Sequence, residues 1–363
     1  AVDKTIDLNA ANWETQLRQW FLSTISSFRS DGFPRTKQLL SSFAFGVLPT
    51  IIFFSSLMSM LYYLGIMQKI VSLFAWIMQR TLGTSGAETL SAAANVFVGQ
   101  TEAPLVIRPY VSKMTQSELM AVMVGGFATI AGGVLAAYVS FGIDAGHLIT
   151  ASVISAPAAL LIAKVMQPET EHSVTMGKVE LHVQDKESNL IEAAASGATA
   201  GMKLAINVAA MLIAFLAIIA MVNGLIGWTG TWFGFEEAHR WTLEKGLGWL
   251  FWPLAYLMGI PAADCGAAGQ LLGTKMVANE FVAYLQLGEL MEAGQQTLSP
   301  RTVTILTYAL CGFANFGSIG IQLGGIGGVA PDRRGDLARL GLRAMIGGTL
   351  AAFMTACIAG ILI

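Results

Sequence analysis

The chain has 363 residues, of which 54% are hydrophobic and only 12% are charged, and its formal net charge is −2. Soluble domains carry about 25% charged residues, so this composition excludes one large soluble domain and an intrinsically disordered chain. The near-neutral charge excludes a basic surface for nucleic acid, and the three widely spaced cysteines indicate neither a disulfide framework nor a zinc site. We therefore expect an all-α polytopic membrane protein, surrounded by lipid in the cell membrane (the inner membrane in a bacterium).

The N-terminal segment, residues 1–42, is polar to amphipathic. A helix over this segment would carry one apolar stripe, formed by Trp13, Leu17, Trp20, Phe21 and Ile25. Such a stripe is typical of a helix that lies in the membrane interface, and equally of a helix packed on the rest of the protein. Both interpretations stay open.

Six intervals without Asp, Glu, Lys or Arg are 19 to 32 residues long. A helix needs about 20 apolar residues to cross the hydrocarbon core of a bilayer. The intervals predict spanning helices at roughly 43–64, 117–141, 147–166, 203–226, 302–325 and 339–361.

Two further stretches, 84–110 and 262–285, are apolar but contain polar residues in their middle. In the first, the polar cluster 100–102 precedes Pro104, which lacks a backbone donor and breaks or kinks a helix. The second carries Asn279-Glu280. Irregular backbone is tolerated at membrane depth only where it is buried or lines a cavity, so both stretches are predicted to be re-entrant helical hairpins.

The chain divides into a first transmembrane unit at 43–166, a polar linker at 167–190 and a second transmembrane unit at 191–363. In each unit a broken hairpin is followed by a helix with a glycine-containing motif and then by a further spanning helix. The loop that contains Asp144 has no Lys or Arg, whereas its counterpart contains Arg333 and several other arginines. Since Lys and Arg favour the cytoplasmic side, the two loops are predicted to lie on opposite sides of the membrane. Matching loops on opposite sides indicate inverted repeats, a common plan of secondary transporters.

Glu102 and Glu280 lie in the two predicted hairpins. A carboxylate at mid-membrane is costly unless it is paired or faces water, so each is a candidate functional residue. The alternative is structural, because a carboxylate also stabilises the N-terminal end of a broken helix. Neighbouring amides and hydroxyls favour a neutral ligand rich in donors and acceptors, such as a sugar ring or a base.

Six stretches carry a family resemblance: Phe43 to Gly65, Asn95 to Leu105, Met114 to Gly133, Asn279 to Tyr284, Tyr308 to Ser318, and Arg333 to Gly341. In these stretches the chain resembles the concentrative nucleoside transporter family, and the resemblance covers about residues 43–363. Members of that family usually begin with two further spanning helices, and residues 1–40 hold no such apolar pair.

The resemblance implies a homotrimeric, sodium-coupled symporter that imports nucleosides by alternating access, with the two hairpins meeting at mid-membrane. It implies that Gln100, Thr101 and Glu102 face the nucleobase, that Glu280, Asn315 and Ser318 hold the ribose hydroxyls, and that Val134 and Phe313 form apolar walls. It also implies that sodium, the coupling ion, is held by the side chains of Asn95 and Thr129 and by the backbone carbonyls of Val98 and Ile130.

The alternative within transport is proton coupling, with Glu102 or Glu280 as the proton carrier. An enzyme is not indicated, because the sequence shows no nucleophile–base pair and no set of metal ligands. A channel would show rings of repeated filter residues rather than two unlike hairpins. The sequence does not separate a purine preference from a pyrimidine preference.

Overall fold

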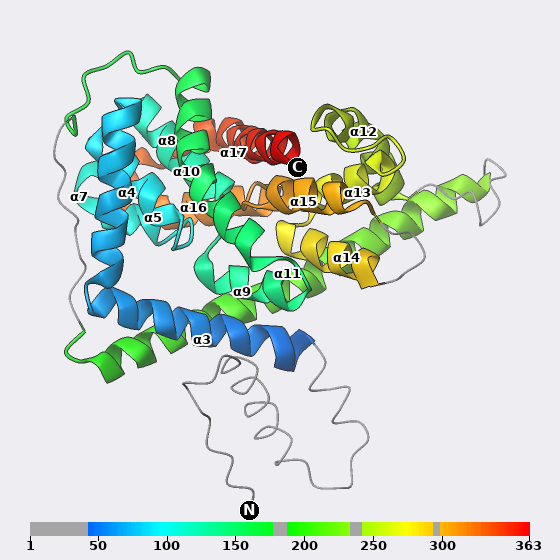
Figure 1. Cartoon of the computed structure of the whole chain (residues 1–363), viewed down its shortest axis with the longest axis horizontal. Helices are drawn as coiled ribbons and strands as arrows, with labels where there is room; N and C mark the ends of the chain where they lie inside the picture. The colour runs from blue at the N-terminus through cyan, green and yellow to red at the C-terminus, as the bar shows by residue number, and fades with distance from the viewer. Residues whose placement is uncertain (1–42, 177–186, 233–241, 293–297) are drawn as a thin grey trace, which may run out of the picture. The chain divides into compact units, whose positions relative to one another are not determined.

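The computed structural model describes residues 43–176, 187–232, 242–292 and 298–363, whose helices are labelled in Figure 1. Two compact units divide the chain, residues 1–49 and residues 50–363, and the described part of the first is the start of helix α3 (Phe43–Tyr63). The amphipathic stripe predicted within residues 1–42 lies outside the described residues. Every regular element in the described ranges is a helix, as the sequence predicts.

The helices between α3 and the predicted linker are α4 (Ile66–Leu82), α5 (Gly86–Asn95), α6 (Ala103–Val106), α7 (Arg108–Val111), α8 (Gln116–Ala128), α9 (Gly132–Ser140) and α10 (Ala145–Met166). Those after it are α11 (Leu190–Trp232), α12 (Leu243–Leu257), α13 (Cys265–Val277), α14 (Glu280–Glu292), α15 (Pro300–Leu310), α16 (Phe316–Val329), the short 3₁₀ helix η2 (Pro331–Arg333) and α17 (Arg334–Leu362).

Several of these helices are long and apolar enough to cross a membrane. Within the described ranges they are Gln116–Ser140, which includes a break, Ala145–Met166 and Pro331–Leu362. The pair Pro49–Tyr63 and Ile66–Leu82 reaches this length and apolarity only when its two helices, which meet at an angle of 80°, are taken together (Figure 1). Gly65 at this bend has a φ of 75°, a left-handed conformation that glycine adopts without strain. The prediction of a membrane protein with several apolar spans is confirmed.

The predicted spans 43–64, 147–166 and 339–361 correspond to α3, α10 and most of α17, and 203–226 lies inside α11. The sequence-based spans omit α4 and α12, because each of these helices contains charged residues and is therefore not a charge-free interval.

The spans predicted at 117–141 and 302–325 are not continuous helices. The first is interrupted at 129–131 and the second at 311–315. At the first break the hydroxyl of Thr129 donates to the Gly125 carbonyl (2.8 Å), which gives that carbonyl a side-chain partner at the helix end. At the second, Gly312 has a φ of 124°, which a residue with a Cβ rarely adopts. Both departures therefore have a local cause in the residues at the break.

The interrupted segments lie against one another. The backbone N–H of Phe313 donates to the Thr129 carbonyl (3.3 Å), and the N–H of Gly132 donates to the Phe97 carbonyl (3.1 Å). Gly312 makes this approach possible, because a Cβ there would lie 2.7 Å from the Phe127 carbonyl oxygen. The unwound stretch between α5 and α6 and the breaks after α8 and α15 thus meet at one place.

Helices α10 and α17 pack against each other. Near the end of α10, the Met166 carbonyl accepts a hydrogen bond from Arg343 of α17 (2.9 Å). Near the start of α10, Nδ1 of His147 lies 3.2 Å from the Tyr308 hydroxyl of α15. Helix α15 also contacts the C-terminal end of the chain, where Arg301 donates to the Ile363 carbonyl (2.9 Å). The loop before α10 and the arginine-rich start of α17 therefore lie toward opposite ends of this helix pair.

Part of the predicted linker is ordered against the helices. The Thr175 carbonyl accepts the N–H of Gly86 (2.9 Å), and the Thr175 hydroxyl donates to Ser85 (3.1 Å). The Gln167 carbonyl accepts from the Ser117 hydroxyl (2.7 Å). The polar composition that predicts a linker here supplies partners for the N-terminal ends of α5 and α8. Residues 177–186 of the linker lie outside the described residues.

Candidate transport site

Three polar side chains join the unwound stretch before α6 to helix α16. Gln100 is buried between α5 and α6, and its Nε2 donates to the hydroxyl of Ser318 (3.2 Å). Its Oε1 accepts a hydrogen bond from Nε2 of Gln322 (3.1 Å), one helical turn further along α16. Gln322 also donates to the backbone carbonyl of Met123 in α8 (3.0 Å). The predicted residues Gln100 and Ser318 are therefore in direct contact.

A second contact joins the start of α14 to the start of α16. Glu280 is 5% exposed, and its Oε2 accepts from Nδ2 of Asn315 (2.9 Å) while its Oε1 accepts from the Tyr138 hydroxyl (3.3 Å). Asn315 is the N-cap of α16, since its Oδ1 accepts from the backbone N–H of Ser318 (2.9 Å). Ser318 therefore links the two contacts into one network that runs from Gln100 to Glu280.

The network places hydrogen-bond donors and acceptors side by side. Carboxylate and amide oxygens accept from hydroxyl groups, while amide N–H groups donate to carbonyl oxygens and ring nitrogens. Glu280, as the first residue of α14, also lies where the helix dipole favours a negative charge. The arrangement can bind a neutral polar ligand with hydroxyl groups.

The other predicted residues lie around this network with fewer polar contacts. Thr101 packs on α16, where a Cβ at Gly325 would lie 2.8 Å from its Cγ2. The side chain of Val134 is buried in the first turn of α9. Phe313 is half-buried at the second break, where its backbone N–H reaches Thr129.

Glu102 differs from Glu280. It is exposed, and its Oε2 would lie 2.4 Å from a Cβ at Gly99, so the carboxylate turns back over that glycine. It occupies the N-cap position of α6, yet its side chain makes no capping hydrogen bond there. The structural interpretation, a carboxylate that caps a broken helix, therefore lacks its defining contact at this residue.

Of the residues predicted to hold sodium, Thr129 and Ile130 directly follow α8, and Asn95 at the end of α5 lies against α8. Asn95 is 0% exposed, and within the described part of the chain neither polar atom of its carboxamide has a hydrogen-bond partner. A Cβ at Gly125 would lie 3.4 Å from its Nδ2, and the Thr129 hydroxyl donates to the carbonyl of that glycine. Buried polar side chains almost always have a partner, so the unpaired oxygen of Asn95 fits a cation held by oxygen ligands. Val98 lies in the unwound stretch after α5, and Ile130 lies in the break after α8.

A buried polar cluster near the far end of α10 was not predicted. Lys164 forms an ion pair with Glu88 (2.7 Å) and donates to the Ser117 hydroxyl (2.9 Å). Glu88 and Glu118 each close a capping box, at the N-terminal ends of α5 and α8. The S/T-x-x-E spacing of Ser85 and Thr115 with these glutamates is the sequence signal that would have found it. The cluster fixes helix ends and lies apart from the Gln100–Glu280 network.

Lys275 is a second buried charge that sequence reasoning did not use. It is 1% exposed in α13, and its Nζ donates to the backbone carbonyl of Ala309 (2.9 Å) near the end of α15. Among the acidic groups, Glu280 is close enough to interact with it electrostatically. An ammonium group in an apolar interior needs such partners, so Lys275 ties α13 to α15.

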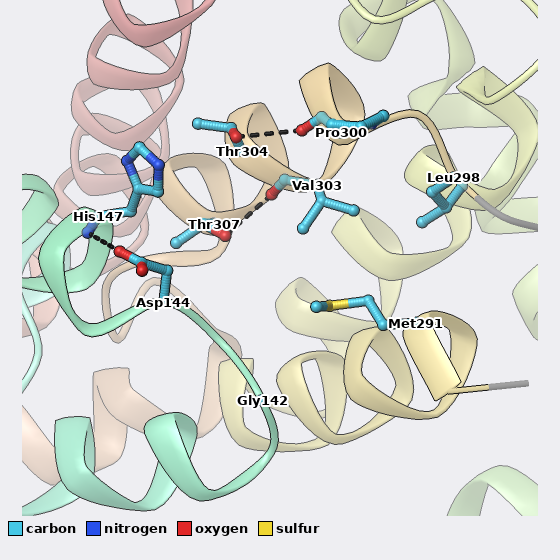
Figure 2. A pocket seen from close by; sticks show the side chains of 9 residues that line it. All are labelled: Gly142, Asp144, His147, Met291, Leu298, Pro300, Val303, Thr304 and Thr307. Atoms are coloured by element: carbon cyan, nitrogen blue, oxygen red, sulfur yellow. Dashed lines mark hydrogen bonds between the residues drawn. The ribbon is translucent and has the colours of Figure 1, made fainter.

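A pocket of about 440 Å³ lies elsewhere, between the loop before α10, the end of α14 and the start of α15 (Figure 2). Asp144 and His147 form one side of it, and the N–H of His147 donates to Asp144 Oδ1 (2.8 Å). The hydroxyls of Thr304 and Thr307 donate to carbonyls of their own helix. None of the residues predicted to bind nucleoside or sodium lines this pocket.

Comparison with known proteins identifies the family. Residues 147–360 match the family described as "Na+ dependent nucleoside transporter C-terminus", and residues 44–145 match the one described as "Nucleoside recognition". The first match alone covers more than half of the chain. The chain belongs to the concentrative nucleoside transporter family.

Curated members of this family are similar over most of the chain. An uncharacterized transporter of Haemophilus influenzae is 53% identical over 88% of this chain and 76% of its own length. Solute carrier family 28 member 3 of Mus musculus is 48% identical over 88% of this chain and 47% of its own length. Sodium/nucleoside cotransporter 2 of Rattus norvegicus is 45% identical over 98% of this chain and 55% of its own length. The chain thus spans about half the length of the mammalian relatives.

Solved structures of CNTnw have the same fold. In an inward-facing substrate-bound state, CNTnw is 44% identical, with a TM-score of 0.83, and the alignment covers 98% of this chain and 87% of that one. A variant of CNTnw in an outward-facing state gives a TM-score of 0.84 at 44% identity, over 97% of this chain and 87% of that one. The predictions of a nucleoside transporter of the sodium-dependent family, embedded in the membrane by several spans, are confirmed. The chain is a transporter and not an enzyme.

Proposed function

We propose that this concentrative nucleoside transporter imports nucleosides together with sodium, and that the network from Gln100 to Glu280 is its substrate site. The observation that carries the proposal is the contact of Gln100 with Ser318 and of Glu280 with Asn315, at the place where three interrupted segments meet. Side chains from separate parts of the chain form one continuous polar surface there.

The two ends of the network serve the two parts of a nucleoside. Glu280, Asn315 and Ser318 bind the ribose hydroxyls, because the carboxylate accepts from a hydroxyl in a charge-assisted bond. Gln100, Thr101 and Glu102 face the nucleobase, and Val134 and Phe313 form the apolar walls on which the ring plane rests.

Sodium binds beside this surface and orders it. Its ligands are the side chains of Asn95 and Thr129 and the backbone carbonyls of Val98 and Ile130. Asn95 supports this assignment, since its buried carboxamide has no other partner in the described part of the chain. The carbonyls belong to unwound backbone, which coordinates sodium in other transporters with broken helices.

Alternating access carries the loaded site across the membrane, as the inward-facing and outward-facing states of CNTnw indicate for that relative. We further propose two inverted units, 43–166 and 191–363, joined by the linker at 167–190, with re-entrant hairpins at 84–110 and 262–285. The opposite placement of the Asp144 loop and the Arg333 end along α10 and α17 supports the inversion. Three chains assemble into a homotrimer. Light scattering of the detergent-solubilised protein tests this, because it measures the molar mass of the assembly.

Uridine uptake into proteoliposomes tests the coupling. Sodium and proton gradients are imposed separately, each with the membrane potential clamped. We expect an inward sodium gradient to drive accumulation and a proton gradient alone to have no effect. Accumulation driven by protons without sodium would replace the sodium mechanism by the alternative in which Glu102 or Glu280 carries a proton.

A further inference from the structure

Gln322 connects the network to the backbone of α8. It is 0% exposed, and its Nε2 has two acceptors, the carbonyl of Met123 (3.0 Å) and Oε1 of Gln100 (3.1 Å). No prediction from the sequence used it, because a glutamine inside an apolar helix gives no signal of its partner.

The Met123 carbonyl fixes which way the Gln322 amide faces. A carbonyl oxygen can only accept, so the nitrogen of Gln322 and not its oxygen must point toward it. Oε1 of Gln322 has no partner within the described residues. The amide is therefore held by its two donated bonds, and turning it over would place two oxygens against each other at Met123.

The orientation of Gln322 sets that of Gln100. Because Oε1 of Gln100 accepts from Gln322, its Nε2 must face the other way, where it donates to Ser318 (3.2 Å). Nε2 carries two hydrogens, and Ser318 takes one of them. Gln100 is thus locked as a donor on the side of the network that holds Ser318.

Gly126 of α8 leaves the room for this arrangement. A Cβ at Gly126 would lie 2.7 Å from Nε2 of Gln322 and 3.0 Å from Cβ of Gln100. A side chain there would force the Gln322 amide to shift from this position. Three separate features, the Met123 carbonyl, the Gln322 amide and a residue without a side chain, therefore maintain one hydrogen-bond polarity.

We propose that Gln322 is a positioning residue that determines base specificity: it makes Gln100 a hydrogen-bond donor, so that the site selects nucleosides whose base presents an acceptor, such as a carbonyl oxygen, at the edge facing Gln100. The proposal rests on the proposed function, in which Gln100 faces the nucleobase. It predicts discrimination between a carbonyl and an amino group at the same position of the base, as in uridine and cytidine.

The variant Gln322→Glu tests the polarity. A carboxylate has no donor and a carboxylic acid has only one, which the Met123 carbonyl takes. In both states the remaining oxygen accepts from Nε2 of Gln100, so the Gln100 amide turns over and presents its oxygen. We expect the ratio of uridine to cytidine affinity, measured by calorimetry in sodium, to fall about tenfold or more relative to the unmodified protein.

A second variant disturbs the contact between Gln322 and Gln100 without introducing a new polar group. Gly126→Ala displaces Gln322 and should lower the same ratio toward equal affinity for the two nucleosides. Gly320→Ala is the matched control, since a Cβ at that position of α16 meets no atom within 4 Å, and it should keep the original ratio.

The outcomes separate this inference from the proposed function. Variants that bind uridine and cytidine with the original ratio, or that lose both in equal proportion, overturn the positioning role and leave the transport site standing. If the unmodified protein binds neither nucleoside in sodium, the proposed function itself fails.

Discussion

At the scale of single residues, Glu280 is the charge that the proposed site depends on most. Its two oxygens accept from different donors, Tyr138 and Asn315. In Glu280→Gln one acceptor becomes a donor that faces another donor, a mismatch of about 1–3 kcal/mol. We expect uridine affinity, measured by calorimetry, to fall by at least about fivefold.

Glu289→Gln is the control for this substitution, because Glu289 is exposed on the same helix. Uridine binding by Glu280→Gln at the affinity of that control would mean that the carboxylate has only a structural role at the start of α14.

Lys275 contributes to stability more than to recognition. Its Nζ donates to the Ala309 carbonyl at 1% exposure. Lys275→Met keeps a long side chain but removes the ammonium group that donates to the Ala309 carbonyl and lies close to Glu280. Each buried acceptor that is left without a partner lowers the free energy of unfolding by about 1–3 kcal/mol. We expect a lower midpoint of thermal unfolding in detergent, whereas Lys113→Met, at an exposed position, should leave the midpoint unchanged. Equal midpoints for the two variants would show that the buried ammonium is dispensable.

Residue identity predicted some of these positions and missed others for a physical reason. Gln100, Thr101 and Glu102 stand out because polar residues interrupt an apolar stretch. Tyr138 does not stand out, since a tyrosine in an apolar helix is typical of a core, and Gln322 becomes visible only when α16 lies against α8. Partners that are distant in sequence require the folded arrangement.

At the scale of elements, small residues let α11 approach the second half of α3. A Cβ at Gly201 would lie 2.8 Å from Cα of Ile52, and one at Gly197 would lie 2.6 Å from the Ser55 carbonyl. Ser56 then donates to the Ala194 carbonyl (2.9 Å). Close approach through small residues is a main source of helix association in membranes.

Gly201→Val should therefore separate α11 from α3 and lower the thermal unfolding midpoint. Gly224→Val on the same helix is the matched control, because a Cβ at Gly224 meets no atom within 4 Å. The same midpoint for both variants would contradict a stabilising contact at Gly201.

Charge-free length predicted where helices run but not where they break. Pro104 predicts the interruption before α6, since a proline is tolerated in the first turn of a helix, where Pro104 stands, but not in its interior. The breaks at 129–131 and 311–315 contain no proline. They depend on the hydrogen bond from the Thr129 hydroxyl to the Gly125 carbonyl and on the left-handed conformation of Gly312. Neither feature interrupts the run of uncharged residues, so the sequence predicts one continuous span at each place.

At the scale of the whole molecule, the proposed inverted plan makes a prediction about the sides of the membrane. Asp144 stands at the start of α10, whereas Arg343 of α17 contacts Met166 at the end of α10, so the exposed Asp332 just before α17 lies toward the opposite end of α10. An α-helix of 22 residues, the length of α10, is about 33 Å long, enough to cross the hydrocarbon core. Single cysteines at these two positions should react with an impermeant reagent from opposite sides, with Asp144 external. Labelling of both cysteines by the impermeant reagent in intact cells would contradict the inverted arrangement.

Coupling between sodium and nucleoside is the property of the molecule that follows from the unpaired Asn95. The ion is expected to bind first, because Asn95 stands five residues before Gln100 and an ion held there orders the unwound stretch that presents the base-binding side chains. One charge moving through 100 mV releases about 2.3 kcal/mol, enough for about 50-fold accumulation before any sodium gradient is counted. Sodium must then raise nucleoside affinity, and nucleoside must raise sodium affinity by the same factor.

Asn95→Ala removes one ligand and should weaken uridine binding at low sodium, with partial recovery at high sodium, because mass action refills a weakened ion site. Thr129→Ser is the control, since it keeps the hydroxyl that is proposed to bind sodium, and its sodium response should match that of the unmodified protein. Calorimetric titrations of uridine at a series of sodium concentrations, with potassium replacing sodium at constant ionic strength, measure both. Affinity of the unmodified protein that ignores sodium but varies with pH would mean that protons, and not sodium, complete the site.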